Sequence, residues 1–152
     1  MQMKDGLGSD DIKILSTTFR KIDFLASVNV DTIDSVFEKI VLKRFPGGRR
    51  IIKENSQGKA LFIIKTGSCL VYKREGLFRK KKIAVLKPGD FFGEMSLISD
   101  YLTSASVMTI EPTELLVYSR TDFLGLIEKN SDIRQKIEKI ADNRRYDTII
   151  RN

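Results

Sequence analysis

The feature of this sequence that most constrains its fold is a series of short strand-like runs between residues 41 and 119. These runs are rich in β-branched and aromatic residues, which favour strands, and turn-forming residues separate them. The separators are Gly47-Gly48, Gly58, Gly67, Gly76, Pro88-Gly89 and Pro112. No segment between the runs is long enough for repeated crossover helices, so the pattern predicts a closed all-β roll rather than βαβ units.

Helical periodicity flanks this β region on both sides. Apolar residues recur at three- and four-residue steps over residues 12–22, behind Ser9 and Asp10 as candidate caps, and over residues 30–40, with Asn29 or Asp31 at the start. Two further helices are predicted after the β region. Their signals are the capping-box spacing of Ser119-Arg120-Thr121-Asp122 before Phe123, Leu126 and Ile127, and the stripe Ile133, Ile137, Ile140 and Ala141.

A chain of 152 residues is long enough for one well-buried core and too short for two ordinary domains. We therefore expect a single domain over residues 1–152. It would comprise N-terminal helices over 1–40, the β-roll over 41–119 and C-terminal helices over 120–152.

A turn, a short strand and a helix start follow one another directly in the sequence and indicate a binding site. Residues 88–90 predict the turn, and residues 91–92 a short buried strand. Gly93 lacks a Cβ and permits close approach of a ligand, and a helical turn from Glu94 would point the N–H groups of residues 95–97 at an anion. Because the carboxylate also accepts hydrogen bonds from sugar hydroxyls, the combination favours a sugar phosphate over a bare anion.

At these residues the chain resembles the cyclic nucleotide-binding domain family, which includes bacterial catabolite activator-type regulators, cAMP-dependent kinase regulatory subunits and nucleotide-gated channels. The likeness extends from about residue 24 to about residue 145. Four glycine-punctuated segments in the family's order carry it, at residues 45–52, 58–67, 86–90 and 92–97. The resemblance implies a mainly β fold with flanking helices, in which a double-stranded β-helix of jelly-roll type carries N-terminal helices and C-terminal lid helices.

The resemblance also implies a ligand site for cyclic AMP or cyclic GMP. Its residues would be Gly93, Glu94, Met95, Ser96, Thr103, Ser104 and Ala105. Glu94 would accept a hydrogen bond from the ribose 2′-hydroxyl, the backbone from Gly93 to Ser96 would cradle the cyclic phosphate, and Ser104 would donate its hydroxyl to a phosphate oxygen. No catalytic residue, metal site or resident cofactor is predicted.

Thr103 departs from the family's pattern, because members that bind cyclic AMP or cyclic GMP usually have an arginine at this position. A hydrogen bond to a charged group contributes about 1.5 to 3 kcal/mol against about 1 for a neutral one, and 1.4 kcal/mol corresponds to about tenfold in affinity. The sequence therefore predicts cyclic nucleotide binding weakened by roughly one to two decades. A weakly bound nucleotide, a different ligand and an unused pocket all remain open.

Composition argues against most enzymatic chemistry. The chain has no histidine, which excludes histidine-based triads and zinc–histidine sites. Cys69 is the only cysteine, so an internal disulfide is excluded and a reducing cytoplasm fits. No apolar run approaches the roughly 20 residues that cross a bilayer, and residues 1–11 lack the apolar core of a signal peptide. We expect a cytoplasmic protein that is not an enzyme and has no membrane partner.

The net charge of +7 is concentrated in one predicted hairpin. Lys73-Arg74 and residues 79–82 flank Glu75-Gly76-Leu77-Phe78. One interpretation is a solvated hairpin that protects a sheet edge. The other is a tip that grips a phosphate backbone or an acidic partner, with Phe78 available to stack.

A helix-turn-helix domain follows in catabolite activator-type regulators, and the chain leaves no room for one before Asn152, so sequence-specific DNA binding is not expected.

Three functional hypotheses follow. The first is a cyclic nucleotide-binding-like sensor with weak affinity for cyclic AMP or GMP, or another small anion, that transmits occupancy through its C-terminal helices. The second is a degenerate, ligand-free domain that serves protein interaction or homodimerisation through the C-terminal helix. The third is non-specific polyanion binding through the basic hairpin.

Overall fold

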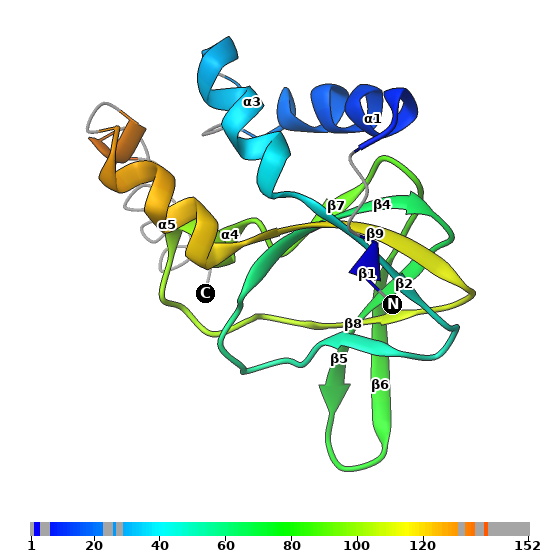
Figure 1. Ribbon diagram of the computed structural model, residues 1–152. Coiled ribbons are helices and arrows are strands. Elements are labelled where there is room, and N and C mark those ends of the chain that lie inside the picture. Colours follow the sequence, from blue (N-terminus) through cyan, green and yellow to red (C-terminus); the bar gives the residue numbers. More distant parts are fainter. Residues whose placement is uncertain are drawn as a thin grey trace.

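The structure is a computed structural model that describes residues 2–3, 7–22, 26, 29–130, 133–135 and 139. Two sheets form its centre, and every strand pair in them is antiparallel (Figure 1). The first sheet has the order β1 (Gln2–Met3), β2 (Val41–Phe45), β9 (Thr113–Ser119), β4 (Ala60–Thr66) and β7 (Phe91–Phe92). The second has the order β3 (Arg50–Ile52), β8 (Ser106–Thr109), β5 (Cys69–Glu75) and β6 (Arg79–Leu86). The prediction of a β region from residue 41 to residue 119 is confirmed.

The helices gather on one side of the five-stranded sheet (Figure 1). They are α1 (Ser9–Phe19), α3 (Val30–Lys39), the single turn α4 (Met95–Ile98) and α5 (Arg120–Glu128). Asn29 caps α3, since its side chain accepts a hydrogen bond from the Thr32 amide at 2.9 Å. Ser119 caps α5 in the same way through the Asp122 amide at 3.1 Å, as predicted. For α1 the predicted cap was wrong, because Ser9 already lies in the helix and Gly8 precedes it.

Alternation along the central strands divides the buried residues into two cores. Leu61 and Ile63 of β4 face the helices with Leu116 and Tyr118 of β9. Their neighbours face the second sheet, in a cluster made of Ala60, Ile64, Cys69, Phe92, Val107, Leu115 and Val117. The closed roll therefore has an interior between its sheets and a separate apolar face under the helices.

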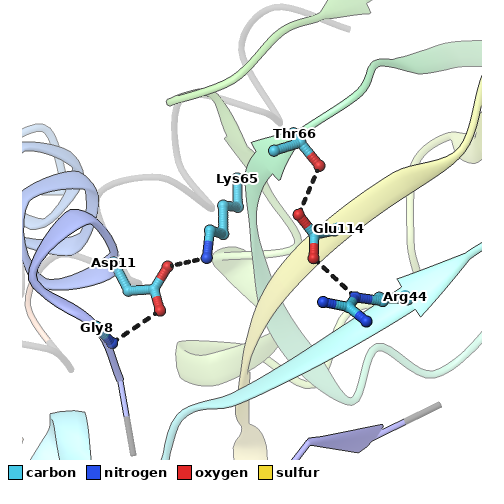
Figure 2. Close-up of polar contacts among 6 residues, drawn as sticks. All are labelled: Gly8, Asp11, Arg44, Lys65, Thr66 and Glu114. Carbon is cyan, nitrogen blue, oxygen red and sulfur yellow. Dashed lines mark hydrogen bonds and ion pairs between the residues drawn. The ribbon is translucent and has the colours of Figure 1, made fainter.

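Two ion pairs tie distant segments to the five-stranded sheet (Figure 2). Asp11 of α1 is buried, accepts a hydrogen bond from the Gly8 amide at 3.1 Å, and forms an ion pair with Lys65 of β4 at 2.7 Å that lacks hydrogen-bond alignment. Glu114 of β9 accepts from Arg44 of β2 at 2.8 Å and from Thr66 of β4 at 3.0 Å. The hydrogen bond from Arg44 lowers the pKa of the Glu114 carboxyl.

Cys69 lies in the interior with no exposed surface, and burial raises the pKa of its thiol to about 11. It packs as a small hydrophobe in the core between the sheets. The helix predicted from Ile133, Ile137, Ile140 and Ala141 falls largely outside the described residues. No helix in the described part of the chain is long and apolar enough to cross a bilayer.

Candidate ligand site

A pocket of about 640 Å³ lies between the two sheets, next to α4. Phe92 of β7 forms part of its floor from one sheet, and Ile52, Val71 and Val107 come from strands β3, β5 and β8 of the other. The α4 turn and the loop before β8 supply the polar part of the lining. An apolar floor below a polar wall suits a ligand with one flat apolar part and one hydrophilic part.

The pocket brings together all seven residues that the sequence singled out. Four come from the start of α4 and three from the loop before β8, namely Gly93, Glu94, Met95, Ser96, Thr103, Ser104 and Ala105. Ser99, Tyr101 and Leu102 also line the pocket and were not predicted from the sequence. Tyr101 and Leu102 are more than half exposed, and two large apolar residues next to Thr103 in a loop are the signal that could have identified them.

The backbone conformation and packing at position 93 require a glycine. Its φ of +80° is unfavourable for other residues, and a Cβ at this position would lie 2.5 Å from the Ala60 carbonyl oxygen of β4. The ring of the preceding Phe92 stacks on Phe62 of β4, with centroids 5.0 Å apart. The close approach that the sequence assigned to a ligand is therefore made by β4, and it seats the start of α4 against that strand.

A second glycine, in the segment that leads into β4, packs against the same turn. A Cβ built on Gly58 would lie 1.8 Å from the Ser96 hydroxyl oxygen and 2.6 Å from the Ser96 Cβ. Both residues are buried. The position of Ser96 in the pocket wall therefore depends on the missing side chain of Gly58.

The backbone of the α4 turn offers fewer free donors than predicted. The Ser96 amide donates to the Gly93 carbonyl at 3.0 Å, and the Leu97 amide donates to the Glu94 carbonyl at 3.1 Å. These bonds between residues three apart close the tight turn itself. The prediction that the Ser96 and Leu97 amides point unpaired at an anion is wrong, because each is bonded to the carbonyl three residues before it.

Glu94 carries the only charge among the described residues that line the pocket. Its side chain is half-buried and does not cap α4. Among the described residues, none forms a hydrogen bond or ion pair with its carboxylate. The carboxylate can therefore accept hydrogen bonds from a ligand hydroxyl, and it disfavours a ligand anion placed beside it.

Thr103 is a structural residue of the pocket rim. Its hydroxyl donates to the Lys53 carbonyl at 2.5 Å and accepts from the Ser56 amide at 3.1 Å. Its own amide donates to the Ser56 carbonyl at 2.9 Å, and its carbonyl accepts from the Asn55 amide at 2.8 Å. The hydroxyl proton is therefore used to hold the rim on the turn after β3, and the Thr103 side chain has no donor left for a phosphate.

Ser104 and Ala105 complete the rim. Ser104 is exposed, and its hydroxyl has no hydrogen-bond partner within the described part of the chain. Ala105 is half-buried and precedes β8. The Ser104 hydroxyl therefore remains free to donate to a ligand.

Comparison with known proteins gives a consistent assignment. The family profile of the Cyclic nucleotide-binding domain matches residues 42–130. The chain is 34% identical over 105 residues to the Cyclic AMP receptor protein of Thermus thermophilus, covering 69% of this chain and 47% of that protein. It is 29% identical to a cGMP-dependent protein kinase of Caenorhabditis briggsae, covering 86% of this chain and 17% of the kinase. The chain thus spans less than half the length of these relatives.

Solved structures agree on the fold. The regulatory domain of Toxoplasma gondii PKA with cAMP superimposes with a TM-score of 0.71 at 20% identity, over 86% of this chain and 50% of that one. The Thermus thermophilus Catabolite Activator Protein superimposes with a TM-score of 0.64 at 25% identity, over 84% of this chain and 60% of that one. The predicted jelly-roll fold is confirmed.

We expect Gly58→Ala to destabilise the domain by about 1 to 3 kcal/mol, because the new methyl group overlaps Ser96. Gly58→Ala combined with Ser96→Gly removes both short contacts and should recover part of that loss. Urea denaturation of the two single variants and the double variant forms the cycle that measures this coupling. Additive effects would contradict the packing described for the turn.

Proposed function

Because the chain belongs to the cyclic nucleotide-binding domain family, we propose that it is a regulatory domain whose pocket between the sheets binds a nucleotide-like ligand. The observation that carries this proposal is the convergence of Gly93, Glu94, Ser96 and Ser104 on one pocket. The proposal treats residues 1–152 as one cytoplasmic domain that performs no chemistry of its own. Ligand binding alone then supplies the signal.

In the proposed complex, the ribose lies against Glu94 and the base lies over the apolar floor. The Glu94 carboxylate accepts from the 2′-hydroxyl, and the Ser104 hydroxyl donates to a phosphate oxygen. The backbone around Gly93 lies against the phosphate. The Ser96 and Leu97 amides and the Thr103 hydroxyl already donate to carbonyls of the protein. The phosphate therefore has fewer donors available than the family pattern implies.

The charges in the pocket support weak affinity for a cyclic nucleotide. Among the described residues, no cationic side chain lines the pocket, and the one charged group in this lining is the Glu94 carboxylate. The phosphate charge must therefore be stabilised by neutral donors alone, beside a group of the same sign. An uncharged nucleoside avoids this repulsion and keeps the contact to Glu94, so adenosine and guanosine belong among the ligands tested.

The proposed route for the signal starts at Asp100, which lies in the pocket loop and forms an ion pair with Arg120. Arg120 is the first residue of α5, and its amide also donates to the Lys59 carbonyl at 2.8 Å. Phe123 anchors the helix, with its ring 6.2 Å from that of Tyr118 at an angle of 81°. Closure of the loop around a ligand would shift Asp100, and α5 would change its pose in response.

The internal bonds of the rim favour a second candidate function. Donors that would serve a phosphate are already paired within the protein, at Ser96, Leu97 and Thr103. A domain whose pocket no longer binds a ligand would instead act through its surface, as an interaction or dimerisation module. Isothermal titration calorimetry with cyclic AMP, cyclic GMP and adenosine separates the two, since only the first function requires saturable binding.

Thr103→Arg should raise cyclic AMP affinity by about tenfold to a hundredfold, because it adds a charged donor beside the phosphate. It should also cost about 1 to 3 kcal/mol of stability, since the Lys53 carbonyl and Ser56 amide lose their partner. Thr103→Val is the matched control, with the same lost hydrogen bonds and no charge. Calorimetry and urea denaturation measure both effects, and equal affinity in the Arg and Val variants would rule out the proposed phosphate position.

Glu94→Gln tests the ribose contact. The unmodified protein should bind cyclic AMP about tenfold more tightly than 2′-deoxy-cyclic AMP, because a hydrogen bond to a carboxylate is lost with the hydroxyl. In the variant this preference should fall to a few-fold, and the 2′-deoxy ligand should bind more tightly as the repulsion disappears. An unchanged preference, measured by calorimetry, would place the ribose elsewhere.

Asp100→Asn should leave ligand affinity within about threefold while weakening the response of α5, because an exposed ion pair contributes little to stability. Hydrogen exchange of residues 120–128 with and without cyclic AMP measures that response. Arg44→Gln, which breaks the Arg44–Glu114 ion pair instead, is the control. A full response in the Asp100 variant would contradict the proposed route.

A further inference from the structure

The turn of the β5–β6 hairpin presents two large apolar side chains to solvent. Leu77 is 85% exposed and Phe78 is 96% exposed. The hairpin projects from the four-stranded sheet on the side away from α1 and α3 (Figure 1). Both side chains therefore extend beyond the body of the protein, where they can meet a flat surface without interference from the helices.

The strands behind this turn carry like charges opposite one another. Arg74 pairs with Lys80, and Lys73 pairs with Lys81. Like charges in register destabilise a hairpin, so the arrangement is unfavourable unless an anion compensates for it. Residues 73–82 together hold six cations and one acid, in a chain whose net charge is +7. Most of the excess charge therefore surrounds the apolar turn.

A second pocket, of about 460 Å³, lies at the base of the hairpin. Tyr72 and Ser106 line it and alternate with Val71 and Val107 of the ligand pocket, so the two pockets lie on opposite faces of the sheet. Its cationic side chains are Arg50, Lys53, Arg74 and Lys80. The lining therefore suits an anion, unlike that of the pocket between the sheets.

Contacts within this second pocket leave its positive charge in excess. The Lys80 ammonium lies 5.0 Å from the centre of the Tyr72 ring, a cation–π contact that turns it toward the body of the protein. Glu54 is the one acid in this lining within the part of the chain that the structure describes. Its carboxylate accepts from the Arg74 amide at 3.1 Å, and its own amide donates to the Ser106 hydroxyl at 2.9 Å.

From the apolar turn, the opposed cations and the basic pocket we propose that the hairpin docks on an anionic phospholipid bilayer. Leu77 and Phe78 enter the interface, and the pocket binds a lipid phosphate. A strand rises about 3.3 Å per residue, which places Lys80 roughly 7 Å along the strand from Phe78. Interfacial apolar groups reach about 5 to 10 Å into the headgroup boundary, so cations at this height meet the phosphates.

The same features fit a single-stranded nucleic acid less well. Binding of a strand needs aromatic rings along a basic groove on which successive bases stack. Phe78 stands next to Leu77, which offers no ring, and Tyr72 is buried under a lysine. The proposal goes beyond the proposed ligand function and replaces the sequence-based prediction of no membrane partner with contact at the bilayer surface.

Sedimentation with vesicles tests the docking. The full chain should bind phosphatidylcholine vesicles that contain roughly a third phosphatidylserine, bind pure phosphatidylcholine far less, and dissociate in high salt. Arg74→Gln with Lys80→Gln should lower affinity by about 25-fold, at about fivefold per cation, without lowering thermal stability. The matched control is Lys13→Gln with Lys21→Gln, which removes the same charge and should change binding little. Equal losses in the two pairs, or no vesicle binding, would overturn the proposal.

A fluorescent reporter tests insertion of the turn. The chain has no tryptophan, so Phe78→Trp places a single one at the tip. Its emission should shift to the blue on addition of the anionic vesicles and be quenched by brominated lipid. Leu77→Ser with Phe78→Ser should weaken vesicle binding by about tenfold or more. Vesicle binding without a shift, or tight binding of a single-stranded DNA oligonucleotide with none to vesicles, would overturn the proposal.

Discussion

The lack of space between the α4 turn and β4 is the constraint on which the pocket depends. At Gly93 the Ala60 carbonyl occupies the position of a side chain, and at Gly58 the Ser96 side chain does. The turn is therefore held in van der Waals contact with residues 58–60, at the start of β4. Everything that lines the polar wall of the pocket, Glu94 included, takes its position from this contact.

The hydrogen bonds within the rim both favour and disfavour ligand binding. The bonds of Thr103 to Lys53 and Ser56 hold the rim in place, so little conformational freedom is lost when a ligand enters. The same bonds consume donors that a phosphate would use. The pocket is thus preorganised in shape, and none of its described lining residues is cationic, while four cationic side chains line the pocket on the far face of the second sheet.

Features that depend on neighbours in the chain could be predicted from the sequence. Turn glycines and strand composition predicted a β region that begins at Val41 and ends at Ser119, and capping chemistry predicted the start of α5. Features that depend on tertiary contacts could not. Thr103 and Lys53 are 50 residues apart and meet only after β3 pairs with β8, so nothing local indicated that this hydroxyl is already bonded.

The double attachment of Arg120 sets how α5 can move. Its amide bonds to Lys59 in the loop before β4 and its guanidinium to Asp100, so polar contacts fix the first residue of the helix, while Leu126 and Ile127 pack against the core further along. Nine residues at 1.5 Å each give a lever arm of about 13 Å. A tilt of about 10° about Arg120 would displace the C-terminal end of α5 by about 2 Å and its N-terminal end hardly at all. The displacement is therefore largest at Glu128, the last residue of α5.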